Sequence, residues 1–174
     1  MNDMLKIVPS LWFDKETEEA VNFYISVFNG SPHKGRDSKI ISLKRYEKGM
    51  EVPGADQMEG KVLTAIFELN GQRFMALDGG PLFKFNEAVS FEIRCDSQEE
   101  VDHYWSRLTE GGDVNAQQCG WLKDKFGVSW QVVPQALVDL MSDPDHVKTG
   151  RVMNAMLQMK KIDVAGLQRA YEGK

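Results

Sequence analysis

Cysteine and histidine are scarce in this sequence. Its 174 residues include two cysteines, Cys95 and Cys119, and three histidines, His33, His103 and His146. Neither a disulfide framework nor a Cys-x-x-Cys metal or redox motif can be built from two cysteines so far apart. We expect both thiols to be free and buried, and Cys119 to be unreactive because no histidine lies near it in the sequence.

Long apolar runs and a basic excess are also missing. No apolar run approaches the ~20 residues of a membrane helix, and the first residues lack the basic and apolar regions of a signal peptide. Lys and Arg number 21 against 26 Asp and Glu, a net charge of −5. A nucleic-acid surface needs a basic stripe, so we expect no nucleic-acid partner. Because the sequence shows neither a membrane helix nor a signal peptide, we expect a cytoplasmic protein with no membrane partner.

The composition is that of one folded domain. Hydrophobic residues make up 42% and charged residues 27% of the chain, which is close to the globular average. The first half predicts a strand, a helix and three further strands, at residues 6–13, 17–29, 39–45, 62–69 and 73–78. The stretch 47–60, rich in charge, Gly and Pro, predicts a loop.

The second half repeats this order. A strand is predicted at 88–95, and Ser97 with Glu100 forms a capping box that opens a helix. Short strands follow at 115–123 and 128–133, and three short helices after Pro134. The two halves align without a gap at an offset of 80 residues, as in Ser10 with Ser90 and Tyr24 with Tyr104. We interpret this match as a duplication, although two unrelated strand–helix units can look alike.

Five motifs carry a resemblance to a known family. They are Ile7–Phe13, Ala20–Tyr24, Phe74–Pro81, Cys119–Asp124 and Gly127–Pro134. Together they resemble the PhnB-like branch of the vicinal oxygen chelate superfamily, whose members are often labelled 3-demethylubiquinone-9 3-methyltransferase. The superfamily includes glyoxalase I, extradiol dioxygenases, and fosfomycin and bleomycin resistance proteins.

The resemblance implies an α+β fold. Tandem βαβββ modules would form a half-closed, barrel-like mixed sheet with helices outside, each module giving four strands. We expect a single domain over 1–174, with modules at about 4–81 and 85–134 and a helical tail at 135–174. The resemblance also implies a homodimer and a ligand cavity on the concave side, between the two modules.

Strand periodicity selects the walls of this cavity. If Phe91, Ile93 and Cys95 pack beneath helices, Ser90, Glu92 and Arg94 lie on the other face. The same parity groups Val8 with Ser10 and Trp12, Ala76 with Asp78, and Ser129 with Gln131 and Val133. The predicted ligand-binding residues are Trp12, Asp78, Ser90, Glu92, Trp121 and Gln131, whereas Trp130 is assigned to the core.

The resemblance also places four metal-ligating corners in the relatives that use a metal. Here they match Val8 (or Pro9 or Ser10), Ala76, Ser90 and Gln131, of which only Gln131 offers a plausible ligand oxygen. A catalytic zinc needs about three His, Cys or carboxylate donors, so we expect neither a metal nor another cofactor. A shifted carboxylate site at Glu92 and Asp78 is the alternative.

The segment Asp78–Pro81 predicts a turn, the alternative being an anion-binding nest of backbone N–H groups.

The function expected from this sequence is metal-free binding or sequestration of a small molecule. Whether any reaction is catalysed is open. The alternative is a divalent-metal-dependent lyase, isomerase or dioxygenase that uses Glu92 or Asp78. A third, weaker alternative is a structural dimerisation module. The methyltransferase label is not supported, because Val8–Leu11 lacks the glycine-rich turn of a Rossmann cofactor site.

Overall fold

The computed structural model describes residues 7–33, 35–51 and 57–174. Contacts within the chain divide it into two units. The first unit holds residues up to Gly30 and from Lys34 to Lys84, and the second holds Ser31–His33 and Phe85–Lys174. Residues 4–6 of the expected first module lie outside the described residues.

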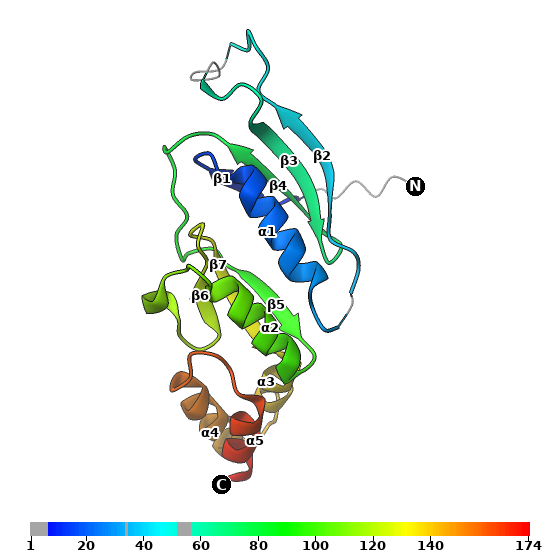
Figure 1. Ribbon diagram of the computed structural model, residues 1–174. Coiled ribbons are helices and arrows are strands. Elements are labelled where there is room, and N and C mark those ends of the chain that lie inside the picture. Colours follow the sequence, from blue (N-terminus) through cyan, green and yellow to red (C-terminus); the bar gives the residue numbers. More distant parts are fainter. Residues whose placement is uncertain (1–6, 34, 52–56) are drawn as a thin grey trace. The chain divides into compact units, whose positions relative to one another are not determined.

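The first unit contains a four-stranded mixed sheet with one helix (Figure 1). Its strand order is β1-β4-β3-β2, with β1 parallel to β4 and the other two pairs antiparallel. Its elements are β1 (Ser10–Phe13), α1 (Thr17–Asn29), β2 (Lys39–Arg45), β3 (Val62–Leu69) and β4 (Gln72–Asp78). Asn70 and Gly71, both at positive φ, form the tight β3–β4 turn that the Asn-Gly pair favours.

Helix α1 covers one face of this sheet. Its buried residues Ala20, Val21, Tyr24 and Val27 recur at helical spacing and are at most 1% exposed. Alternate residues of β3 and β4 form the matching sheet face, including Ala65, Phe67, Phe74 and Ala76. We call the opposite side of each sheet its open face.

The second unit repeats the arrangement with one strand fewer. Its sheet has the order β5-β7-β6, with β5 parallel to β7 and β6 antiparallel to it. The elements are β5 (Phe91–Cys95), α2 (Gln98–Thr109), η2 (Val114–Ala116), β6 (Trp121–Lys123) and β7 (Ser129–Pro134). The expectation of four strands per module is wrong for this unit, because Val114–Ala116 forms a 3-10 turn capped by Asp113.

The duplication predicts this topology correctly. In each unit the first strand leads into a helix and pairs in parallel with the last strand, so the fold consists of two βαβββ-like modules and C-terminal helices. The strands described here form two separate sheets rather than one barrel-like sheet, which corrects that part of the expectation.

The tail forms three helices with a small core of their own. Helices α3 (Gln135–Met141), α4 (His146–Leu157) and α5 (Val164–Glu172) surround a cluster of Leu137, Val152, Ile162 and Leu167. Backbone hydrogen bonds from Cys119 to Met159 (2.8 Å) and from Gly120 to Lys160 (2.8 Å) attach the tail to the loop before β6. In the described part of the chain, none of the helices has the length and hydropathy needed to cross a bilayer.

Candidate functional site

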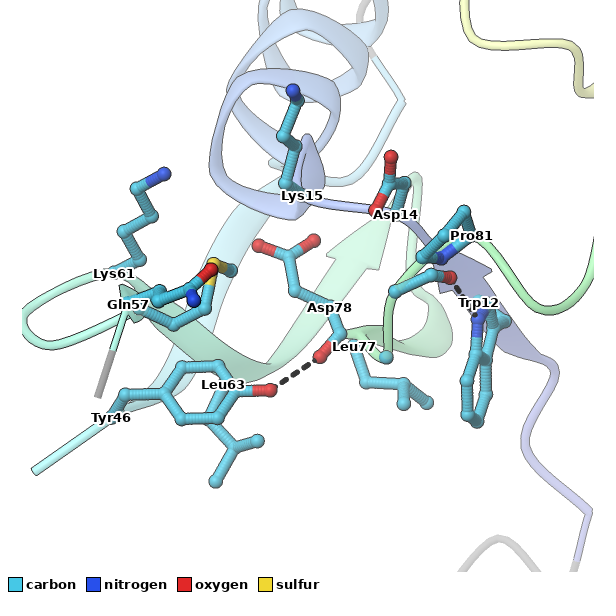
Figure 2. A pocket seen from close by; sticks show the side chains of 13 residues that line it. Trp12, Asp14, Lys15, Tyr46, Gln57, Lys61, Leu63, Leu77, Asp78 and Pro81 are labelled. Carbon is cyan, nitrogen blue, oxygen red and sulfur yellow. Dashed lines mark hydrogen bonds between the residues drawn. The ribbon is translucent and has the colours of Figure 1, made fainter. Parts of the chain in front are cut away.

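A pocket of about 750 Å³ lies in the first unit, where β1 and β4 end (Figure 2). Trp12 and Pro81 border it on one side and Tyr46 on the other, with Leu63, Leu77 and Asp78 between them. Its remaining lining residues are Asp14, Lys15, Gln57, Met58, Lys61, Gly79 and Gly80. The pocket therefore combines apolar side chains with charged groups of both signs.

Trp12 is held in a fixed position at the edge of this pocket. Its indole N–H donates to the Gly80 carbonyl at 2.9 Å, and its ring meets Phe83 edge-on with centroids 5.0 Å apart. A Cβ atom at Gly79 would come within 2.2 Å of the indole ring, so only glycine fits beneath it. The indole is thus a preorganised aromatic wall.

The segment Asp78–Pro81 is a turn. The Gly79 N–H donates to the Phe13 carbonyl at 2.9 Å, and the Gly80 N–H to the Asp14 carbonyl at 3.1 Å. These donors are used within the fold, and Gly80 has a φ of +83°, which a turn accommodates through glycine. The turn interpretation is therefore favoured over an anion-binding nest.

Asp78 and Ala76 share a face, but it is the helix-covered one, which corrects the expected assignment. The parallel register pairs Ala76 with Leu11 and Asp78 with Phe13, both of which are buried. Asp78 is 2% exposed, and its Oδ1 accepts the Thr17 N–H at 2.8 Å, at the start of α1. Burial raises the pKa of this carboxyl group, with smaller contributions from Glu16 and Asp14.

Tyr46 and Leu77 line the pocket although the sequence did not single them out. The Tyr46 hydroxyl donates to the Asp78 carbonyl at 2.7 Å, and burial raises the pKa of this phenol. Leu77 pairs with Trp12 in the β1–β4 register, so these two side chains share the open face. Correct parity for β4 would have selected Leu77 in place of Ala76.

Four predicted ligand-binding residues lie together on the open face of the second sheet. Glu92 pairs with Gln131, and Gln131 with Trp121, so the three side chains form one row across the strands. The Gln131 amide donates to the Ser90 hydroxyl at 2.9 Å. Glu92 forms an ion pair with Arg94. Trp130 lies on the other face, 2% exposed, as predicted.

A second row lies beside the first. Ser129 pairs with Lys123, whose ammonium forms an ion pair with Glu87, on the connection before β5. Ser129 was expected on this face, whereas Lys123 and Glu87 were not predicted. Glu87 and Lys123 are 36 residues apart in the sequence, so no local motif predicts their pairing.

The arrangement of donor groups does not fit a catalytic metal. Among the described residues, no three His, Cys, Asp or Glu side chains lie close enough to hold a metal ion. The carboxylates of the alternative site are engaged, Glu92 with Arg94 and Asp78 with the Thr17 N–H. His33 contacts the Ser97 hydroxyl at 3.1 Å, a surface contact.

The thiols differ in their environments. Burial raises the pKa of the Cys95 thiol to about 12, so it stays protonated at neutral pH. Cys119 is free but only half-buried, which corrects the expectation that both thiols are buried. Its φ is positive, at 52°, and its N–H donates to the Met159 carbonyl of the tail.

The comparisons establish the family. Residues 5–133 match the model described as 3-demethylubiquinone-9 3-methyltransferase, so this chain belongs to that PhnB-like family. A putative 3-demethylubiquinone-9 3-methyltransferase, PhnB protein, from Bacillus cereus is 35% identical with a TM-score of 0.62, over 74% of this chain and 98% of that one. Among curated proteins, none matches this chain.

More distant solved structures are also similar to this chain. Protein PA1353 from Pseudomonas aeruginosa is 24% identical with a TM-score of 0.59, over 75% of this chain and 97% of that one. FosX, a fosfomycin resistance protein from Listeria monocytogenes solved with Mn(II) and sulfate, is 15% identical with a TM-score of 0.48, over 77% of this chain and 91% of that one.

Proposed function

We propose that this chain binds a small organic molecule without a metal ion, and that the pocket beside Trp12 is part of its binding site. The pocket itself carries the proposal. Its volume of about 750 Å³ lies within the roughly 300–1,000 Å³ of small-molecule sites. Such sites combine apolar walls with a few fixed polar groups, as Trp12, Leu77 and Asp78 do here.

The open face of the second sheet is a second candidate binding surface in this proposal. Ser90, Glu92, Trp121 and Gln131 offer hydroxyl, carboxylate, indole and amide groups on neighbouring strands. Side chains on paired strands are held more precisely than side chains on loops, which suits them to orient a ligand. Variants of each unit test which of the two surfaces binds the ligand.

Metal-free binding is supported by the donor chemistry. A divalent ion prefers several carboxylate, imidazole or thiolate ligands, and Gln131 is one neutral, weak donor. The metal-dependent alternative requires Glu92 or Asp78 to exchange its present partner for a metal. Elemental analysis of protein purified without chelator tests this point, since stoichiometric metal lost in E92A or D78A would establish the alternative.

Methyl transfer, which the family description names, is not the function that this geometry favours. Rossmann-type methyltransferases bind their cofactor at a glycine-rich turn in alternating β/α units. The chain instead has two mixed sheets, and β1 is followed by Asp14 and Lys15.

A fragment screen tests the proposal. The wild-type chain is mixed with a library of small aromatic and aliphatic molecules, and binding is detected by saturation-transfer NMR with and without EDTA. We expect binders that survive EDTA and weaken about fivefold or more in W12A, because truncating an important aromatic contact typically costs over 1 kcal/mol. W105A is the matched control, since Trp105 lies on α2, outside the pocket.

The proposal fails if no fragment binds, or if binders respond equally to W12A and W105A. Retained binding in W12A together with loss in W121A would move the site to the second unit alone. The expected homodimer is a separate proposal, and light scattering after size-exclusion chromatography tests it.

A further inference from the structure

Ser129 is an unusual residue on the open face of the second sheet. It is 3% exposed, and its Oγ has no hydrogen-bond partner among the described residues. Buried hydroxyl groups are nearly always paired, because desolvation without a partner is unfavourable. An orphaned hydroxyl on the ligand-facing side of a sheet therefore indicates a group that a ligand can satisfy.

Two further donors lie next to Ser129. Lys123 is directly across from it in the β6–β7 register, where facing Cβ atoms are about 4.5–5.5 Å apart. Ser90 precedes β5 and would continue the β5–β7 register opposite Ser129. Its oxygen accepts the Gln131 amide at 2.9 Å, which leaves the Ser90 O–H proton available for donation.

Lys123 already holds a carboxylate. Its side chain is 22% exposed, and its ammonium pairs with Glu87, whose side chain is 62% exposed. A largely solvated carboxylate gains little from an ion pair and is readily displaced. Glu87 thus shows what kind of group Lys123 accepts.

We propose that Lys123, Ser129 and Ser90 form a subsite for an oxyanion group of the ligand, a carboxylate or a phosphate, and that Glu87 occupies Lys123 until the ligand binds. The inference rests on the proposed function and names the chemical class of its ligand. The ammonium supplies charge, and the two hydroxyls supply directed hydrogen bonds to the anion. Glu92 does not oppose an anion here, because Arg94 compensates its charge.

Titration with inorganic phosphate and, separately, acetate tests the subsite in the full chain. The backbone amide of Ser129 and the side-chain amide of Gln131 are followed by NMR, and the two probes distinguish phosphate from carboxylate ligands. We expect E87Q to bind the preferred probe about threefold to fivefold more tightly, because its neutral amide competes less for Lys123. We expect S129A to bind it about fivefold to tenfold more weakly, since a hydrogen bond to a charged group is lost.

K123M is expected to lose phosphate or acetate binding by about tenfold or more. K125M is the matched control, because Lys125 is an exposed residue of the β6–β7 turn that carries the same charge. Equal losses in K123M and K125M would show nonspecific attraction and overturn the subsite, as would unchanged binding in S129A or E87Q. All variants are first compared with wild type by thermal unfolding.

This outcome is separate from that of the fragment screen. If neutral fragments bind beside Trp12 but neither anion shifts the Ser129 and Gln131 signals, the subsite is wrong and the proposed function stands. If the anions bind as expected but no fragment binds, the pocket in the first unit fails as the ligand site.

Discussion

The open faces of the two sheets can be compared row by row, because β1 pairs with β4 as β5 pairs with β7. Trp12 and Leu77 in the first unit correspond to Glu92 and Gln131 in the second. In the next row Met75 faces Ile66, whereas Ser129 faces Lys123. At these positions the same backbone framework thus presents apolar side chains in one unit and polar side chains in the other.

The helix-covered faces differ much less. Val21 and Tyr24 of α1 have buried counterparts in Val101 and Tyr104 of α2. Burial constrains these positions to apolar side chains, while the open-face positions can diverge without disturbing the core. The two units therefore differ mainly on their open faces, where a change of side chain leaves the core intact.

The β6–β7 hairpin of the second unit and the β3–β4 hairpin of the first are stabilised differently. Substitution of Asp124 in the β6–β7 hairpin has the largest expected effect on stability. This buried residue accepts the Phe126 and Val128 N–H groups at 2.9 and 3.0 Å through Oδ1, and the Trp130 indole N–H at 2.8 Å through Oδ2. In the first unit the β3–β4 turn depends instead on the backbone conformation of Asn70 and Gly71. D124A should lower the free energy of unfolding by about 3–5 kcal/mol, because it strands buried donors.

Urea denaturation measures this loss. D113A is the control, since Asp113 caps the exposed 3-10 turn through the Asn115 N–H at 2.9 Å and should cost less than about 1 kcal/mol. Equal losses in the two variants would refute a special role for Asp124.

The sequence predicted α1, α2 and the tail helices because their apolar spacing and capping residues are local signals. The face of β4 could not be assigned in this way. Both alternating sets of β4 are apolar, with Phe74 and Ala76 on one side and Met75 and Leu77 on the other. Only pairing with β1 decides between them, and a polar residue at the strand end, Asp78, favoured the wrong choice.

The second-sheet candidates were easier to predict. Ile93 and Cys95 are apolar and Glu92 and Arg94 are charged, so parity alone separates the faces of β5. The Lys123–Glu87 pair was missed because it joins a strand to a distant connection. Long-range register is the information that one sequence lacks.

The N-termini of α1 and α2 provide a second comparison between the two units, with a smaller expected effect on stability. α2 is capped locally, since the Ser97 hydroxyl accepts the Glu100 N–H at 3.2 Å and the Glu100 carboxylate accepts the Asp96 N–H at 2.7 Å. S97A should therefore cost about 1 kcal/mol in unfolding free energy. S106A, an exposed serine inside the same helix, is the control and should leave stability nearly unchanged. A loss in S106A as large as that in S97A would contradict a capping role.

The start of α1 depends instead on Asp78 at the end of β4, 61 residues away in the sequence, which predicts a pH dependence specific to the first unit. The pKa of Asp78 is raised in the folded protein, so the folded state binds this proton more tightly than the unfolded state does. The stability that Asp78 contributes is therefore greatest below its ordinary pKa of 3.8 and falls as the pH rises through the raised value.

D78N should lose this part of the pH dependence, because its amide oxygen can still accept the Thr17 N–H without carrying a charge. Urea denaturation of wild type and D78N between acid and neutral pH measures the difference. Parallel stability curves for the two proteins would show that burial of the Asp78 charge is not what sets the slope.

The smallest expected effect is a change in the pKa of Glu87. It distinguishes the Lys123–Glu87 ion pair on the open face from the Arg45–Glu18 ion pair of the first unit. Hydrogen bonding to Lys123 lowers the pKa of Glu87, as hydrogen bonding to Arg45 lowers that of Glu18 in the first unit. K123M should let the pKa of Glu87 rise towards its ordinary value of 4.5 and leave Glu18 unchanged. Binding of the preferred anion to wild type should have the same effect, because the ligand would displace Glu87 from Lys123. Carbon-13 NMR titration of the glutamate carboxyl groups measures the pKa values of Glu18 and Glu87 in one experiment. If the anion raises the pKa of Glu18 as much as that of Glu87, the cause is ionic screening and not displacement of Glu87 from Lys123.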